Sequence, residues 1–124
     1  MKIFVLVAAM IGAALAEDIA VFYTTANDNL DMDAVVNDPQ QLQAFVDCFL
    51  DRKPCEPVPA SYKLIIPESI EQGCRKCNPA QKHLANTFLT GLQKNMPEEY
   101  DNFVKKFDPK GIYMNEFLES VRNL

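Results

Sequence analysis

The sequence has no tryptophan, a single histidine and only four glycines among its 124 residues. The histidine, His83, lies among Gln81, Lys82 and Asn86 on the outer half of a predicted helix, which indicates a solvated surface residue. A serine or cysteine nucleophile needs such a base beside it. Gly-x-Ser-x-Gly, His-Glu-x-x-His and glycine-rich phosphate motifs are also absent from the sequence. We therefore predict that the protein is not an enzyme and uses no cofactor.

Acidic residues outnumber basic ones: the sequence has 17 Asp and Glu and 12 Lys and Arg, which gives a formal net charge of -5. Nucleic acids and anionic membrane surfaces are bound by clustered Lys and Arg. The sequence also lacks internal repeats, low-complexity segments and an Asn-x-Ser/Thr sequon. We expect a single domain with no nucleic-acid partner and no N-linked glycan.

No apolar run reaches the roughly 18 to 20 residues that a membrane anchor needs. The run at residues 3–15 is shorter and follows the positive Lys2, and Ala14-Leu15-Ala16 fits a small-residue cleavage site before the acidic Glu17. This pattern is typical of a secretory signal peptide over residues 1–16. We expect residues 17–124 to form a soluble, secreted, monomeric domain without stable membrane insertion.

Strand-like alternation persists nowhere for more than a few residues, so the predicted class is all-α. Two segments, Asp38-Pro39-Gln40-Gln41 and Asn78-Pro79-Ala80-Gln81, carry the cap, first-position proline and third-position glutamine of a helix start. Apolar residues at helical spacing follow each start. Pro67 must bend or split one further helix. Six helices are predicted, over residues 27–36, 38–52, 61–71, 78–95, 97–107 and 113–122.

All four cysteines lie between Cys48 and Cys77, with six, eighteen and two residues between successive members. In a secreted chain this spacing favours disulfides, for which the sequence allows three connectivities. The positions of the cysteines, around one helix end and the next helix start, favour pairing between neighbours. A redox Cys74-Arg75-Lys76-Cys77 motif and a four-cysteine zinc site are the alternatives.

Apolar side chains are in surplus, since five of the predicted helices carry an aromatic or branched aliphatic stripe. A packed core accounts for most of them. Six helices in about 108 residues can also leave a pocket, and small-molecule sites are often apolar spaces between helices. Two functions follow: a carrier of a small apolar ligand, or a secreted structural or interaction protein with a filled core.

Five short stretches spread over the chain narrow this choice. They are Tyr23-Thr24-Thr25, Asp28-Asn29-Leu30, Phe45-Val46-Asp47-Cys48, Lys76-Cys77 and Phe107-Asp108-Pro109-Lys110-Gly111. Together with the cysteine spacing, they make the chain similar to the insect chemosensory proteins of the OS-D or A10 family. The resemblance implies six helices around an apolar ligand channel, with disulfides Cys48 to Cys55 and Cys74 to Cys77. It also implies transport of fatty-acid-like lipids or semiochemicals.

Seven side chains are predicted to contact the ligand. Phe45, Tyr100 and Phe117 resemble pocket positions of that family. The stripes of the predicted helices add four more, which are Phe49, Ile65, Ile66 and Phe88. No catalytic residue and no metal ligand is predicted.

Overall fold

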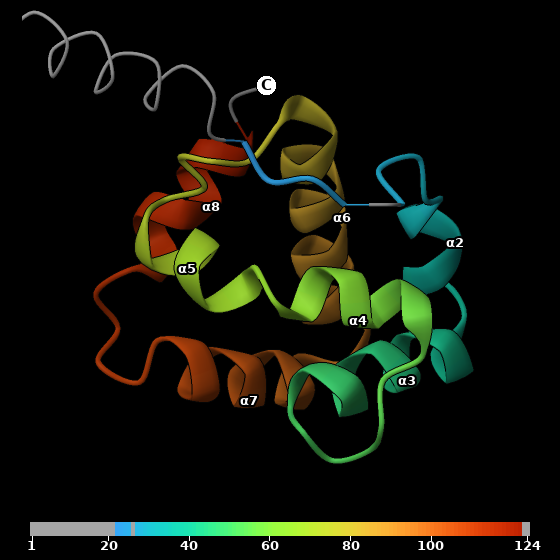
Figure 1. The fold of residues 1–124 in the computed structure, drawn as a ribbon. Helices are drawn as coiled ribbons and strands as arrows, with labels where there is room; N and C mark the ends of the chain where they lie inside the picture. Colours follow the sequence, from blue (N-terminus) through green and yellow to red (C-terminus); the bar gives the residue numbers. More distant parts are fainter. Residues whose placement is uncertain (1–21, 26, 123–124) are drawn as a thin grey trace, which may run out of the picture.

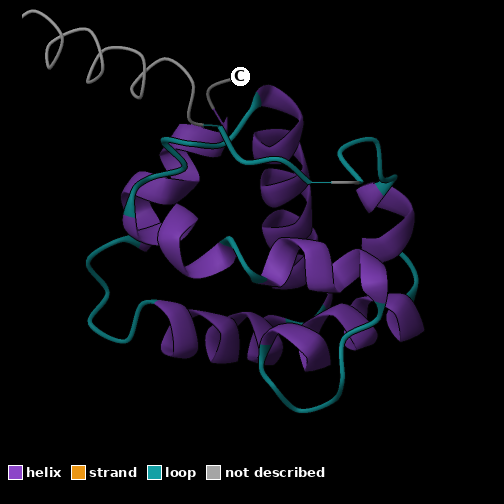
Figure 2. Cartoon of the chain, in the orientation of Figure 1, coloured by secondary structure: helices purple, strands orange, loops and turns teal. Residues whose placement is uncertain are grey.

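The computed structural model describes residues 22–25 and 27–122, and within these residues the chain is all-helical without strands (Figure 2). The all-α prediction is therefore confirmed. The predicted signal peptide, residues 1–16, lies outside the described residues. The described helices are α2 (Met32–Val36), α3 (Pro39–Phe49), α4 (Pro57–Lys63), α5 (Ile66–Glu71), α6 (Pro79–Asn95), α7 (Pro97–Phe107) and α8 (Met114–Arg122).

Helix α6 is the centre of the arrangement, because it packs against α2, α7 and α8 (Figure 1). Helix α3 packs against α2, α4 and α7, while α5 contacts α8 and α7. Among the described helices α6 is the longest, and its buried Leu84, Phe88 and Leu92 recur at helical spacing. Gly91 allows α2 to come close, since a Cβ added there would lie 2.5 Å from Cβ of Val36.

The first predicted helix is shorter than expected. Helix α2 begins at Met32 because the Asp31 carboxylate caps it by accepting from the Ala34 N–H at 3.2 Å. Helical spacing from Leu30 would turn Ala34 inward, but this residue is exposed while Val35 and Val36 are buried.

The third predicted helix, residues 61–71, is two helices, so the described residues hold seven helices and not six. Pro67 lies in the first turn of α5, where its missing N–H costs nothing, and its ring excludes a continuous helix from Lys63. Helix α4 also begins earlier than predicted, because Pro57 occupies its first turn and opens the helix.

The second predicted helix ends three residues early, at Phe49. Leu50 is its C-cap and Asp51 has a positive φ of 60°, which turns the chain away from the helix. The following loop is fixed by the Arg52 guanidinium, which donates to both Glu99 carboxylate oxygens at 2.6 and 2.9 Å. This pair ties the loop to the start of α7.

Both disulfides join neighbouring cysteines, as predicted. Cys48 pairs with Cys55 and Cys74 pairs with Cys77, so all four cysteines are used. A four-cysteine zinc site would need free thiolates, so the pairing disfavours that alternative. The Cys74-Cys77 bond is also buried, which restricts the access that thiol exchange requires.

A turn over residues 108–111 links α7 to α8 and holds the start of α8. The Asp108 carboxylate is 2% exposed and accepts from the N–H groups of Ile112, Tyr113 and Met114 at 2.9, 3.1 and 3.0 Å. Burial acts to raise the pKa of Asp108, but these backbone donors outweigh it and hold the pKa below its usual value. Asp108 therefore positions the helix that carries Phe117.

Candidate functional site: an apolar cavity between α4, α5 and α6

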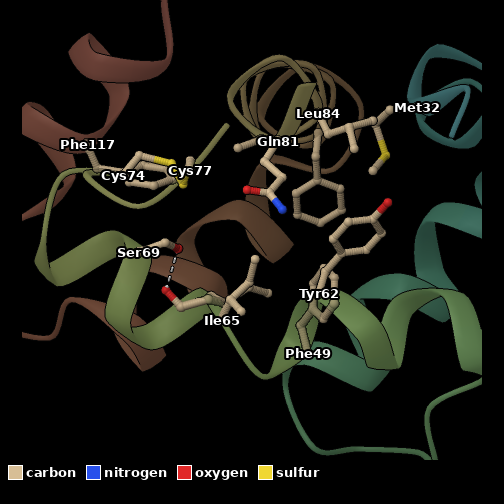
Figure 3. Close-up of a pocket in the computed structure, with 13 residues that line it drawn as sticks. Met32, Phe49, Tyr62, Ile65, Ser69, Cys74, Cys77, Gln81, Leu84 and Phe117 are labelled. Atoms are coloured by element: carbon tan, nitrogen blue, oxygen red, sulfur yellow. Dashed lines mark hydrogen bonds between the residues drawn. A yellow bond between two sulfur atoms is a disulfide. The ribbon is translucent and has the colours of Figure 1, made fainter. Parts of the chain in front are cut away.

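An internal cavity of about 80 Å³ lies where α4 and α5 face α6. Figure 3 shows Tyr62, Ile65 and Leu84 converging on this space from different elements. In the described part of the chain its lining carries no charged side chain. The lining residues are Met32, Phe49, Tyr62, Ile65, Ile66, Ser69, Cys74, Cys77, Gln81, Leu84, Ala85, Phe88 and Phe117.

Aromatic rings form one wall. The rings of Phe49 from α3 and Phe88 from α6 meet edge to face with their centroids 5.4 Å apart. The Phe88 ring also contacts Phe103 of α7 at 6.1 Å. This geometry is the favourable one for aromatic pairs, so the wall is fixed by packing across three helices.

The break between α4 and α5 supplies another part of the wall. Ile65 and Ile66 line the cavity and are half-buried, whereas the preceding Leu64 is 85% exposed. A continuous helix would rotate these residues in regular steps, and the break instead presents two consecutive isoleucines to the same space. Pro67 therefore shapes the cavity indirectly.

The polar groups of the lining are satisfied within the protein. The Gln81 amide is 5% exposed; its Nε2 donates to the Tyr23 carbonyl at 3.1 Å and to Thr25 Oγ1 at 3.0 Å. Its Oε1 accepts from the Asn78 N–H at 2.9 Å, which completes the capping box of α6. Ser69 Oγ donates to the Ile66 carbonyl at 2.9 Å. Because their polar atoms bond within the protein, Gln81 and Ser69 present mainly carbon atoms to the cavity.

The Tyr62 hydroxyl is also hydrogen-bonded within the protein. It donates to the Asn27 carbonyl, and burial together with the nearby Asp28 charge raises its pKa to about 12. A phenol with this pKa stays protonated at neutral pH and acts as a hydrogen-bond donor. The arrangement is suited to holding an apolar molecule.

Five of the seven predicted contact residues line this cavity: Phe49, Ile65, Ile66, Phe88 and Phe117. The other two lie elsewhere. Phe45 lines a second hollow, of about 450 Å³, between α2, α3 and α4. Tyr100 lines a third, of about 400 Å³, between α7 and α8. As ligand contacts, all seven residues stay predictions.

Several lining residues had a sequence signal that pointed to another role. In the sequence, Leu84 and Ala85 stand at helical spacing from Phe88, and Tyr62 stands at helical spacing from Ile65 and Ile66. Gln81 was identified as a capping residue. The buried Cys74-Cys77 disulfide was identified as a staple, yet it lines the cavity beside Phe117 (Figure 3).

Within residues 22–25 and 27–122, no helix is long and apolar enough to span a bilayer. The same residues contain no cluster of three or more His, Cys, Asp or Glu side chains that could hold a metal ion.

A small helical domain with two local disulfides and an apolar cavity is typical of helical proteins that bind small ligands. The chain belongs to the insect pheromone-binding family, A10/OS-D, which it matches over residues 23–115. It is 32% identical over 103 residues to Allergen Tha p 1 of Thaumetopoea pityocampa, which covers 81% of this chain and 82% of that protein.

Two solved structures have similar folds. One is a chemosensory protein in complex with bromo-dodecanol, with 30% identity and a TM-score of 0.71 over 78% of this chain and 97% of that one. The other is the antennal chemosensory protein A6 of the moth Mamestra brassicae, with 29% identity and a TM-score of 0.65 over 81% of this chain and 93% of that one.

Proposed function

We propose that the protein is a secreted, soluble carrier that binds a small apolar ligand of the long-chain type in the internal cavity and releases it chemically unchanged. The observation that carries this proposal is the cavity lining, which is apolar and, among the described residues, uncharged. Apolar surface removed from water supplies the affinity, at about 0.8 kcal/mol per buried methylene.

Relatives support a long alkyl chain as the ligand. The similar chemosensory protein in complex with bromo-dodecanol holds a molecule of this kind. The cavity of this chain, at about 80 Å³, is smaller than the ~150 Å³ engineered cavity that accommodates benzene. A long chain therefore has to displace part of the wall as it enters.

The break between α4 and α5 is the wall best placed to move. These two helices have seven and six residues, so neither is stable by itself. Displacing Ile65 and Ile66 outward requires rotation of the backbone at Leu64 and Ile65, the two residues between α4 and α5. We propose that Phe49, Phe88 and Phe117 form the fixed side of the site and that the two isoleucines form its adjustable side.

Native mass spectrometry of the protein secreted from an insect host tests the proposal. The expected mass corresponds to residues 17–124 as a monomer with two disulfides, together with an apolar ligand that dissociates without covalent change. A protein that leaves the host empty and takes up no long-chain alcohol, acid or ester would indicate the alternative, a structural or interaction protein with a filled core.

A further inference from the structure

Basic residues are unevenly distributed along the chain. No Lys or Arg occurs in the sequence between Lys2 and Arg52, whereas Asp31, Asp33 and Asp38 gather around α2 and the start of α3. Figure 1 shows α2 on the side of the molecule opposite the turn that joins α7 to α8. The acidic net charge therefore does not describe every face of the molecule, and the positive charges have to be located individually.

Four lysines gather where α4 and α7 end, and we call them the lysine cluster. Lys63 is the last residue of α4, and Lys105 and Lys106 lie in the last turn of α7. Lys110 follows in the turn after α7, and both Lys105 and Lys110 are exposed. The Asp51 carboxylate joins the two helix ends, because one of its oxygens accepts from Lys63 Nζ and the other accepts from Lys106 Nζ at 2.6 Å.

Nearby carboxylates leave the lysine cluster positive. Asp51 balances one of the four lysines, and Asp101, one helical turn before Lys105, balances a second. The Asp108 carboxylate is buried and bonded to backbone N–H groups inside the domain. Four lysines less two exposed carboxylates leave two positive charges on a surface that faces water.

Two large aliphatic side chains flank the lysine cluster. Leu64 directly follows Lys63 and is 85% exposed, and Ile112 stands two residues after Lys110 and is 62% exposed. In Figure 1 the break between α4 and α5, which holds Leu64, lies directly above α7, and α5 contacts both α7 and α8. The two side chains and the lysine cluster therefore belong to one side of the molecule.

Each of these features is ordinary by itself. Lysines are favoured in the last turn of a helix, where the dipole is negative, and single exposed aliphatic side chains are common on protein surfaces. Their combination is more specific, because apolar side chains beside clustered Lys bind anionic bilayers by partial burial and by electrostatic attraction. A nucleic acid would use the lysines but not Leu64 and Ile112.

We propose that the lysine cluster, Leu64 and Ile112 form a docking face for the anionic surface of a lipid bilayer. The lysines contact phosphate groups of the lipid heads, and the two aliphatic side chains enter the boundary between head groups and acyl chains. Docking of this kind is reversible, because such a face lacks the strength of a membrane-spanning helix. The proposal does not depend on the carrier function, although the two meet at the break between α4 and α5, where Leu64 stands next to the cavity-lining Ile65.

Co-sedimentation of the secreted chain with lipid vesicles tests the proposal. Vesicles of phosphatidylcholine mixed with phosphatidylglycerol are expected to bind the wild type at low salt. Vesicles of phosphatidylcholine alone should bind it at least tenfold more weakly, since they offer no net negative charge. In about 1 M salt, where the Debye length is about 3 Å, binding to the anionic vesicles should fall to the level of the neutral ones.

A pair of charge-matched variants locates the lysines that act. Lys105→Gln/Lys110→Gln removes two exposed charges and should weaken binding to anionic vesicles by roughly 25-fold, at about fivefold per lysine. The control is Lys82→Gln/Lys94→Gln on α6, which changes the net charge equally. Lys94 adjoins Asn95, whose amide donates to the Val36 carbonyl of α2 at 2.8 Å, so this control lies towards the acidic side. It should bind as the wild type does.

A second set of variants tests the aliphatic side chains. Leu64→Gln and Ile112→Gln should each weaken binding by about tenfold or more, the loss expected for a large apolar side chain that is no longer buried. Both residues are exposed, and circular dichroism checks that the variants keep the wild-type fold. The control is Phe22→Gln, because Phe22 is 60% exposed and lies outside the docking face. It should leave binding unchanged.

Each result bears on the docking face. Absence of binding to anionic vesicles, equal weakening in the two charge-matched variants, or weakening by Phe22→Gln would overturn the proposal. Retention on immobilised heparin without vesicle binding would also overturn it and would indicate a soluble polyanion as the partner. A wild type that binds dodecanol in solution in any of these cases keeps the carrier function. Binding to anionic vesicles that is weakened only by changes in the docking face supports the proposal.

Discussion

Replacing Ala85 by leucine should fill the internal cavity and thereby raise stability while removing ligand binding. Ala85 lies on α6, lines the cavity and is half-buried. At about 24 cal/mol per Å³ of cavity, complete filling of about 80 Å³ is worth about 2 kcal/mol. Three added carbon groups at ~0.8 kcal/mol each give a similar figure.

Thermal unfolding followed by circular dichroism measures this gain. For a domain of this size each kcal/mol of added stability raises Tm by about 4 °C or less. A gain of about 2 kcal/mol therefore raises Tm by up to roughly 8 °C. Dodecanol binding to the same variant should fall to the level of a short alcohol. Ala80→Leu on the same helix is the control, because Ala80 is also half-buried but does not line the cavity.

Two results would refute this reasoning. If Ala85→Leu bound dodecanol as tightly as the wild type, the cavity would not be the ligand site. If the variant melted at a lower temperature than the Ala80→Leu control, the space beside Ala85 would be too rigid or too narrow to accept a side chain, and the same would hold for an alkyl tail.

Three further predictions concern the framework of the site. Gly91→Ala places a Cβ 2.5 Å from Cβ of Val36, and overpacking costs about 1 to 3 kcal/mol against a helix-propensity gain of at most ~1, so chemical denaturation should show a net loss. Arg52 holds the pKa of Glu99 at about 2, below the usual 4.5. A carboxylate with a lowered folded-state pKa adds stability above its unfolded pKa and loses it as pH falls towards the folded value. The Tm difference between wild type and Arg52→Gln should therefore be full at pH 6, shrink from about pH 4.5 and vanish near pH 2; a difference independent of pH would disprove the role of the pair. Asp108→Ala leaves the buried Met114 N–H at the start of α8 without its acceptor. Hydrogen exchange should show loss of protection in α8 first, whereas uniform loss would contradict this local role.

The parts of the fold that could be predicted from the sequence are those determined by neighbouring residues. The Asp38 cap, whose carboxylate accepts from the Gln40 N–H at 3.1 Å, and the Asn78–Gln81 capping box both stand where the sequence pattern placed them. The apolar stripes of α3 and α6 are buried as their spacing predicted. Neighbour pairing of the cysteines was favoured by their positions at helix ends and implied by the family resemblance.

The remainder depends on contacts between distant residues. Pro67 was predicted to bend or split a helix, and the structure shows a split, after which α5 packs against the distant α8. Gln81 was a capping residue by pattern, and its bonds to Tyr23 and Thr25 join segments more than fifty positions apart. The family resemblance pointed to Phe45 and stripe geometry pointed to Phe49, but neither could tell that the two residues line different hollows.

The central claim is that the tail of an apolar chain lies in the internal cavity, and intermolecular NOEs measured with ¹³C-labelled dodecanol test it most directly. The account predicts contacts from the terminal methyl group to the Phe88 ring of α6 and to the Ile66 side chain of α5, which both line the cavity. Saturable binding with contacts only to exposed apolar side chains such as Leu64 and Ile112 would contradict it.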